Sequence, residues 1–470
     1  MKALSKLFRF PGDARAWTGL YPKIFKRSII DIQAFKDKYL DLPKPLDGSK
    51  LKPLTAKVAA TYKTPPISTQ MLSREFIDDS LYNPHYGYFS KQAVIFSPET
   101  SIPFNELRDS IEFLNIVADK YKEIEDDISH TNDIARQVWH TPTELFKPWY
   151  GYAIAKHIVE KFLNTSPRPK QLKIYEMGAG NGTLMMNIMD FIRKTYPELY
   201  PHTYYQIIEI SSKLVERQQE NSLLRDVVSA HHNVSIINCS IFEWNTLVPE
   251  PCFFIALEVL DNFAHDVIRY DILKGDAPYQ GLVLTGPDGA FEEVFEPAHD
   301  PLIKEYLDIR KNIGYNSPLL DNPLWRRSRA KLPFAHFLTS REFIPTRAFQ
   351  FLQILHDRFP SHHLIMSDFF KLPDAVDGWM GPVVQTRYKN TMVPCSTYMV
   401  QPGWFDIFFP TDFELFKRVY DHLGKARSDS SSVMTQHDFL LKFGDLNSTT
   451  TKSGENPFLT YYENNKFFLS

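Results

Sequence analysis

The chain has 470 residues, of which 43% are hydrophobic and 23% are charged, and its net charge is -3 at pH 7. This length exceeds one ordinary domain and predicts a large α/β domain with additional segments. The small net charge gives no electrostatic reason to expect a nucleic-acid partner. The three cysteines form no CxxC pair, and no HExxH motif or Cys/His cluster is present, so neither a disulfide framework nor a metal site is expected.

Residues 1–30 differ from this average composition. Lys2, Lys6 and Arg9 would lie near one face of a helix, and Asp13 is the single acid of the first 27 residues. A basic, acid-poor and amphipathic segment predicts mitochondrial targeting, here to the matrix. The alternative is an ordinary solvated basic helix. No apolar run is long enough for a transmembrane helix, so stable membrane insertion is not predicted.

The next two regions precede the predicted core. Residues 31–66 are rich in proline and lysine and predict an extended linker. Residues 67–165 predict an N-terminal helical region that takes part in substrate binding. Its pattern indicates a helix that begins at Ser68 and ends at Leu81, a charged helical segment over 105–130, and an amphipathic helix over 147–163.

Residues 166–427 form the predicted core, in which short apolar runs alternate with helical patterns. The predicted strands are 171–176, 204–210, 234–239, 252–260 and 362–370, and helices are predicted over 183–196 and 211–225. Apolar strands that alternate with helices indicate parallel βαβ units in a doubly wound α/β sheet, because such strands are covered on both faces.

The later segments are assigned as additions to this core. An insertion over about 266–360 is expected to contain a hairpin over 266–300 and then mostly helices. Residues 391–400 and 403–409 are expected to form a final antiparallel pair. Residues 428–470 begin with a stretch rich in Ser, Thr and Asp and predict a polar C-terminal tail.

The turn after the first predicted strand carries three glycines, Gly178, Gly180 and Gly182. In an open α/β sheet, ligands bind at this edge. The dinucleotide fingerprint GxGxxG would need its third glycine where Thr183 stands, and the Walker pattern would need a Lys-Ser/Thr pair after its last glycine. Both phosphate-binding interpretations are therefore disfavoured.

Acids at two strand ends favour a cationic ligand instead. Glu176 lies two residues before the first glycine, where a carboxylate repels a pyrophosphate and attracts an ammonium or sulfonium. Glu209 ends the second strand, where an acid can accept hydrogen bonds from two ribose hydroxyls. Ser240 and Ile241 follow the third strand and are expected to border an adenine. This set predicts S-adenosylmethionine as the cofactor; the alternative is a tight turn whose glycines serve packing.

Acidic residues also follow the fourth predicted strand. Methyl transfer from a sulfonium is an in-line displacement, which an enzyme assists by positioning and electrostatics. Glu258 and Asp261 are predicted to orient a guanidinium acceptor, with His265 as a candidate proton acceptor. Asp261 has the alternative role of capping the next helix. Asp368 ends a later strand, where it lines the same cleft or caps a loop.

Several segments carry a family resemblance. The segments EMGAGNGTLMMNIM, IALEVLDNFAHDVIRY and GWFDIFFPTDF resemble, in order and spacing, motifs of the MidA-type mitochondrial class I S-adenosylmethionine-dependent methyltransferases, the complex I assembly family. In WHTPTELFKPWYGYAIAKHI, the residues Thr141, Pro142 and Phe146 match a further motif. The resemblance spans about residues 65–445.

The resemblance implies a fold and an activity. The fold is a doubly wound, mostly parallel seven-stranded class I methyltransferase sheet with an N-terminal helical arm and a helical insertion. The activity is protein arginine N-methylation, with a protein substrate such as a respiratory-chain subunit and a role in respiratory complex assembly. Two alternatives remain at this point: a non-catalytic assembly factor with a methyltransferase-like fold, and an NAD-dependent oxidoreductase.

Overall fold

The computed structural model describes residues 46–470, apart from 92–93, 96–97, 99, 130–137, 166–168, 211–232, 322–327, 329–336, 389–390 and 425–430. The predicted targeting segment, residues 31–45 of the predicted linker and the helix predicted over 211–225 therefore lie outside the described residues. None of the described helices is long and apolar enough to cross a membrane.

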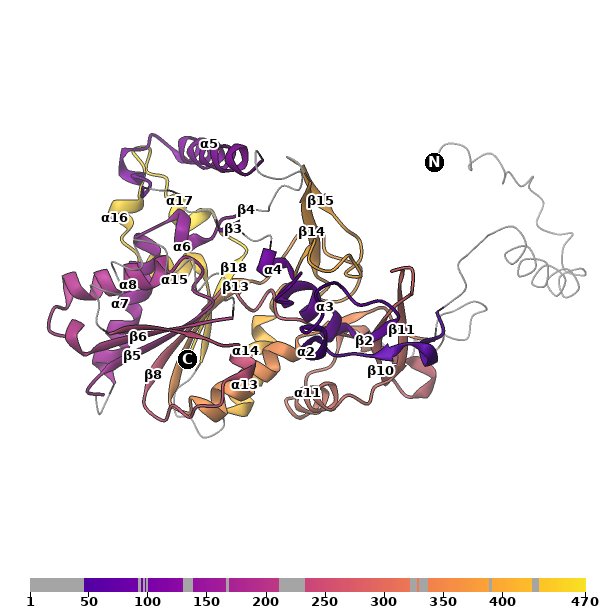
Figure 1. The fold of residues 1–470 in the computed structure, drawn as a ribbon. Coiled ribbons are helices and arrows are strands. Elements are labelled where there is room, and N and C mark those ends of the chain that lie inside the picture. The colour runs from indigo at the N-terminus through magenta and orange to yellow at the C-terminus, as the bar shows by residue number, and fades with distance from the viewer. Residues whose placement is uncertain are drawn as a thin grey trace, which may run out of the picture. The chain divides into compact units, whose positions relative to one another are not determined.

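The core of the fold is a seven-stranded sheet (Figure 1). Its strands, in spatial order, are β17 (Ser432–Thr435), β18 (Asn465–Leu469), β13 (His362–Phe369), β8 (Cys252–Leu257), β5 (Leu172–Met177), β6 (Thr203–Glu209) and β7 (Val234–Asn238). The strands from β13 to β7 are mutually parallel, whereas β18 is antiparallel to both of its neighbours, so the sheet is mixed. From β5 the chain continues to β6 and β7 on one side, and it then returns to β8 on the other side of β5. The strand order therefore reverses between β5 and β8, and the carboxyl ends of these strands are the expected ligand edge.

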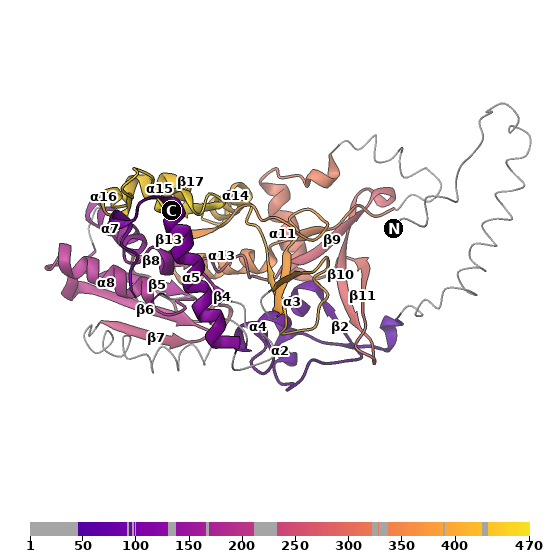
Figure 2. The ribbon, with the colours of Figure 1, turned by 90° about the horizontal axis from the view of Figure 1, so that it is seen from above.

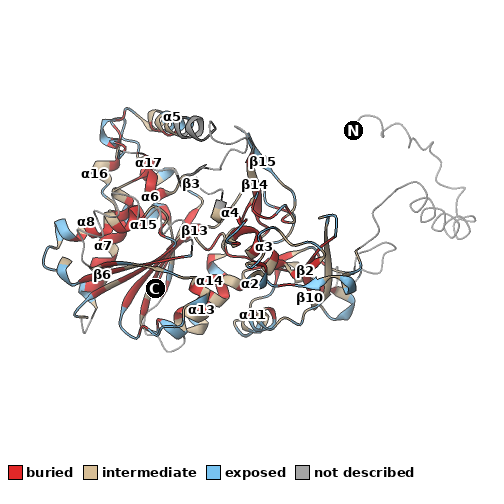
Figure 3. Cartoon of the chain, in the orientation of Figure 1, coloured by how far each residue is buried: buried red, intermediate tan, exposed pale blue. Residues whose placement is uncertain are grey.

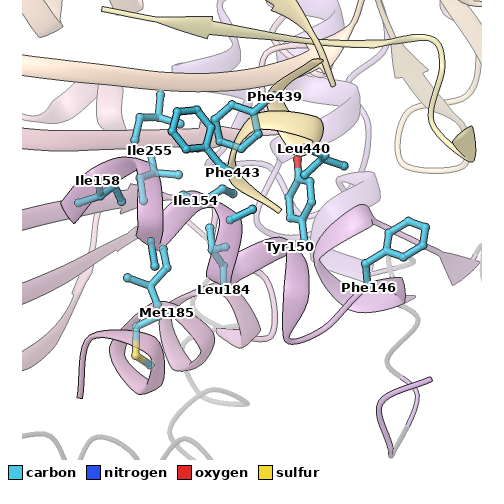
Figure 4. Packing of buried hydrophobic residues seen from close by; sticks show 14 of the residues in the cluster. Phe146, Tyr150, Ile154, Ile158, Leu184, Met185, Ile255, Phe439, Leu440 and Phe443 are labelled. Carbon is cyan, nitrogen blue, oxygen red and sulfur yellow. The ribbon is translucent and has the colours of Figure 1, made fainter. Parts of the chain in front are cut away.

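Both faces of this sheet are covered, as its apolar strands require. Along β5, Ile174 packs into one hydrophobic cluster and Tyr175 into another, because successive side chains point to opposite faces. The first cluster includes α7 (Trp149–Asn164), α8 (Thr183–Thr195) and α15 (Gln436–Phe443); Figure 4 shows Ile154, Leu184 and Phe439 packed there with Ile255 of β8. The second includes α13 (Thr346–Arg358) and α14 (Phe413–Leu423). Figure 3 shows buried residues along the strands of this sheet and along these helices.

The insertion over 266–360 begins with strands that include the expected hairpin, and its helices follow residue 300 as the sequence predicted; the mainly helical insertion that the resemblance implied is wrong for residues 266–300. It contributes β9 (Asp266–Asp271), β10 (Ala277–Thr285), β11 (Phe291–Pro297) and β12 (Glu342–Ile344) to a second, six-stranded sheet, with α11 (Pro301–Asn312) between β11 and β12. The other two strands are β1 (Lys52–Pro53) and β2 (Thr69–Leu72), and β2 pairs with β10. Figure 2 shows this sheet as a layer separate from the seven-stranded sheet.

The N-terminal segment is therefore part of the folded unit and not an arm. The helix predicted from Ser68 begins at Ser73 (α3, Ser73–Tyr82), because the four residues before it are strand β2. Arg74 of α3 forms buried ion pairs with Asp266 of β9 and with Asp300, the N-cap of α11. The long helix α5 (Ser110–Ser129) also lies in this region. Shorter helices are α2 (Ala56–Ala59), α4 (Tyr88–Lys91), α6 (Pro142–Leu145), α16 (Leu446–Thr449) and α17 (Pro457–Thr460), and β3 (Val94–Ile95) pairs with β4 (Val138–Trp139).

Two expectations for the C-terminal part were wrong. Segments 391–400 and 403–409 do not pair with each other; β15 (Thr391–Pro394) and β16 (Asp406–Phe408) each pair with β14 (Val383–Tyr388), which lies between them. Residues 428–470 are not a polar tail in their described part, because β18 is inserted between β13 and β17. The side chains of Phe467 and Phe468 are fully buried on opposite faces of the sheet.

Candidate functional site

The glycine turn joins β5 to α8 at the ligand edge. Gly178, Gly180 and Gly182 have φ values of 71°, 53° and 76°, which lie in the left-handed region that favours glycine. The amide of Gly178 donates to the carbonyl of Ile208 on β6 (3.0 Å), and Gly182 directly precedes α8. The turn thus needs its three glycines for its backbone conformation, and it exposes no side chain from those positions to a ligand.

A residue that sequence analysis missed holds this turn in place. Glu144 of α6 is buried, and its Oε1 accepts hydrogen bonds from Asn181 Nδ2 (2.9 Å) and from Thr183 Oγ1 (2.8 Å). Thr141 caps α6 and so positions Glu144. The sequence did contain a clue to Glu144. Its neighbours Thr141, Pro142 and Phe146 match a family motif, but the acid itself was not identified.

The two acids expected to favour a cation lie at adjacent strand ends. Glu176 is buried, and its Oε2 accepts a hydrogen bond from the hydroxyl of Tyr205 (2.7 Å). Burial raises the pKa of Glu176 to about 7; the bond from Tyr205 opposes this shift and the charge of Glu209 adds to it. Glu209 is the last residue of β6 and is also buried, and its carbonyl accepts from Asn238 Nδ2 (2.8 Å). The structure therefore brings both acids close to the glycine turn.

Ser240 and Ile241 follow β7 at the same edge. Ser240 is the N-cap of the short 3-10 helix Ile241–Glu243, and its Oγ accepts from the amide of Phe242 (3.3 Å). Ile241 is buried within the hydrophobic cluster that also contains Tyr175 and Ile208. Both residues have structural roles in this conformation, and their placement beside an adenine stays a prediction.

The turn after β8 lies directly against the glycine turn. A side chain on Gly178 would place its Cβ 3.1 Å from Cγ2 of Val259, so the two turns pack closely. Glu258 has a φ of 51°, which is uncommon for a residue with a side chain and occurs often at functional sites. Its amide donates to the carbonyl of Ser367 (2.8 Å), and its Oε1 accepts from Asn465 Nδ2 (3.4 Å). The structure thus brings Glu258 next to the predicted cofactor turn.

Further carboxylates surround this second turn. Asp261 is buried, as are Asp368 at the end of β13 and Asp406 at the start of β16. Burial raises the pKa of Asp261 to about 7. Burial, followed by the charge of Asp261, also holds the pKa of Glu258, Asp368 and Asp406 well above the usual range. Asp406 was not singled out from the sequence, because its segment was assigned to an antiparallel pair with residues 391–400.

His265 lies differently from the expected proton acceptor. Its ring stacks on Phe409 with centroids 3.8 Å apart, and its Nδ1 donates to the carbonyl of Phe263 (2.8 Å). Burial lowers its pKa to about 3, so the ring is neutral and a weak base at neutral pH. Its ring also lines a mainly apolar cavity, together with Leu260 and Phe416. This arrangement supports a packing role more than proton transfer.

Comparison with known proteins places the chain in a family. Residues 153–430, more than half of the chain, match the family described as "Putative S-adenosyl-L-methionine-dependent methyltransferase". The chain is 24% identical over 384 residues to the Schizosaccharomyces pombe protein named "Protein arginine methyltransferase NDUFAF7 homolog, mitochondrial", a match that covers 79% of each chain. A crystal structure of a Burkholderia thailandensis protein bound to S-adenosyl-homocysteine has the same fold, with a TM-score of 0.52 at 15% identity; the match covers 85% of this chain and 88% of that one.

Proposed function

The chain belongs to the S-adenosyl-L-methionine-dependent methyltransferase family, and we propose that it methylates an arginine side chain of a mitochondrial protein. S-adenosylmethionine is its cofactor. The name of the Schizosaccharomyces pombe relative supports both the arginine acceptor and the mitochondrial location. The basic, acid-poor residues 1–30 support delivery to the matrix. A respiratory-chain protein, methylated during complex assembly, is the substrate class that we propose.

The ligand edge fits this cofactor. The glycine turn presents only backbone there, so a ligand can approach it closely, and the buried acid Glu176 would disfavour a pyrophosphate such as that of NAD at this turn. We assign Glu209 to the ribose hydroxyls and Glu176 to the electrostatic environment of the cationic part, with Ser240 and Ile241 near the base. A sulfonium cofactor supplies an electrophilic methyl group, and the chain orients the reactants and provides the electrostatic environment.

The observation that carries the arginine proposal is the set of carboxylates at the turn after β8. Val259 of this turn packs against Gly178, and Glu258 and Asp261 lie on either side of Val259 in the sequence. Carboxylates there can pair with the guanidinium, fix its plane and stabilise positive charge as a nitrogen attacks the methyl group. In such a transfer the nitrogen–methyl bond would form as the sulfur–methyl bond breaks, and the acceptor nitrogen would release one proton to solvent.

The proposal is tested by identifying the methylated residue. The full chain is incubated with methyl-labelled S-adenosylmethionine and a mitochondrial extract from cells that lack the endogenous protein, and the labelled proteins are hydrolysed to amino acids. We expect the label in methylarginine. Label only in methyllysine or in another residue would contradict an arginine acceptor, and the absence of any labelled protein would contradict protein methylation.

A further inference from the structure

The dipeptide Asp261–Asn262 joins three carboxylates from separate parts of the chain. The amide of Asp261 donates to Oδ2 of Asp368 (3.0 Å), and the amide of Asn262 donates to Oδ1 of Asp261 (3.0 Å). The side chain of Asn262 donates from Nδ2 to Oδ1 of Asp406 (3.1 Å). Asp368 comes from the end of β13 and Asp406 from β16, so two sheets deliver acids to one turn.

These three carboxylates are buried without a basic partner. Within the part of the chain that the structure describes, they form no ion pair with Lys, Arg or His, and the charges that act on them belong to other acids. Asp406 is fully buried, yet its Oδ2 accepts no hydrogen bond from any described residue. A buried carboxylate oxygen without a donor is costly, and like charges in contact add to the cost. The cluster is therefore suited to a cationic guest.

The spacing of the acids limits what that guest can be. Among the described residues, no three His, Cys, Asp or Glu side chains converge closely enough to hold a metal ion. Hydrogen bonds from a single planar group with several N–H donors can instead reach carboxylates that lie apart, as a guanidinium does. The cluster also borders the rest of the site. Asn262, which bonds to two of its members, is half-buried, and its carbonyl accepts from the hydroxyl of Tyr82 (3.1 Å).

We propose that Asp406 is a further acceptor-binding residue, which receives the substrate guanidinium through its free Oδ2 together with Asp261, and that Asp368 positions Asp261. This inference rests on the proposed function and extends it, because it assigns acceptor recognition to the three-stranded sheet β15–β14–β16 as well as to the turn after β8. It also has a consequence for protons. Burial raises the pKa of these acids, whereas a guanidinium beside them favours their charged forms, so its binding is expected to release protons.

The test uses two small probes of nearly equal shape. Ethylguanidine carries the positive charge of an arginine head group, and ethylurea is its neutral counterpart. Both are titrated into the full chain loaded with S-adenosyl-homocysteine, and binding is followed by ligand-observed NMR. We expect the native protein to bind ethylguanidine at least about tenfold more tightly than ethylurea, since a charge-assisted bond is roughly twice as strong as a neutral one. Asp406→Asn is expected to lose this preference.

A matched control is Asp79→Asn. Asp79 is also a buried acid, but it bonds to Tyr86 and Asn83 and lies outside the cluster, so its variant should keep the preference. Equal binding of both probes by the native protein, or an unchanged preference in Asp406→Asn, would overturn the inference. Weaker binding of S-adenosyl-homocysteine by Asp406→Asn would overturn it too, because Asp406 would then serve the cofactor.

A second measurement needs only the native chain, which covers the case in which Asp406→Asn does not fold. Calorimetric titration of ethylguanidine near pH 7, in two buffers of different ionisation enthalpy, reports the protons released. We expect proton release, and its absence would contradict the inference. The outcomes also separate this inference from the proposed function. Methylarginine formation without a preference for ethylguanidine would contradict only the role of the acid cluster in acceptor binding. A preference for ethylguanidine with the label on another residue would contradict only the arginine methylation activity.

Discussion

Individual backbone positions explain why the cofactor turn was recognisable from the sequence. Gly178, Gly180 and Gly182 all adopt left-handed conformations, and such positions appear in a sequence as alternating glycines. The prediction that S-adenosylmethionine is the cofactor is confirmed by the family match. Residues that support the turn from another part of the chain were harder to recognise in the sequence. Glu144 contacts the turn from a separate helix, and nothing local in the sequence identifies that long-range contact.

The substitution Gly180→Val tests the turn directly. A β-branched side chain at a φ of 53° is strained by about 1–2 kcal/mol and would occupy space beside the cofactor. We expect loss of measurable S-adenosylmethionine binding in calorimetry, with a folded chain by circular dichroism. The matched control is Gly275→Val, since Gly275 has a φ of 68° and open space around its Cβ position. Unchanged affinity in Gly180→Val would show that the ligand binds elsewhere.

Strand ends form the site at the scale of secondary structure, and here sequence analysis succeeded only in part. The strands β5, β6, β7 and β8 were predicted, as were the acids at the ends of β5 and β6 and after β8, because apolar runs and turns are local signals. The pairing of β2 with β10 was missed, because the paired residues Gln70 and Leu284 are far apart in the sequence. Nothing in either segment indicates its partner strand. For the same reason Asp406 was not placed near Asp261.

The strand-end acids predict how stability depends on pH. Glu176 and Asp261 have pKa values of about 7 in the folded chain, whereas the unfolded chain releases these protons near pH ~4. The folded state thus binds more protons across this window, so these groups make stability fall as pH rises from about 4.5 to 7. We expect the melting temperature of the cofactor-free chain to fall over that range. In Asp261→Asn the total decrease should be smaller than in the native chain by about 2 °C or more. An equal or steeper fall in the variant would contradict this expectation.

At the scale of the whole molecule, the C-terminus completes the sheet that carries the site. Strand β18 bonds to β13, whose last residues include Asp368, so the chain's end supports the acid cluster. The sequence did not reveal this role. The strand has only five residues, and the polar segments before it resemble a tail. The position of β18 depends on its pairing with β13 and β17, and the amino-acid composition of the segment does not indicate those partners.

The substitution Phe467→Ala tests whether this strand is structural. Phe467 is fully buried and stacks on Phe439 with ring centroids 3.9 Å apart. Its truncation should lower the free energy of unfolding by about 3–5 kcal/mol, measured by denaturant titration. Leu441→Ala, on the exposed side of the neighbouring helix α15, should change it by no more than about 0.5 kcal/mol. Similar stabilities for the two variants would argue that β18 contributes little to the fold.

The central claim is that the carboxylates after β8 serve methyl transfer, and the double variant Glu258→Gln/Asp261→Asn tests it most directly. Glutamine and asparagine keep the shape and remove the charge. Interactions made mainly in the transition state affect turnover more than ground-state binding. The measurement is the rate of methylarginine formation in the mitochondrial extract, with S-adenosylmethionine affinity determined on the same samples. We predict a rate at least about 100-fold below that of the native chain, at nearly unchanged cofactor affinity. A native rate in the double variant would contradict the account, as would full rescue of a deletion strain by a variant that labels nothing, because the chain would then act as a scaffold.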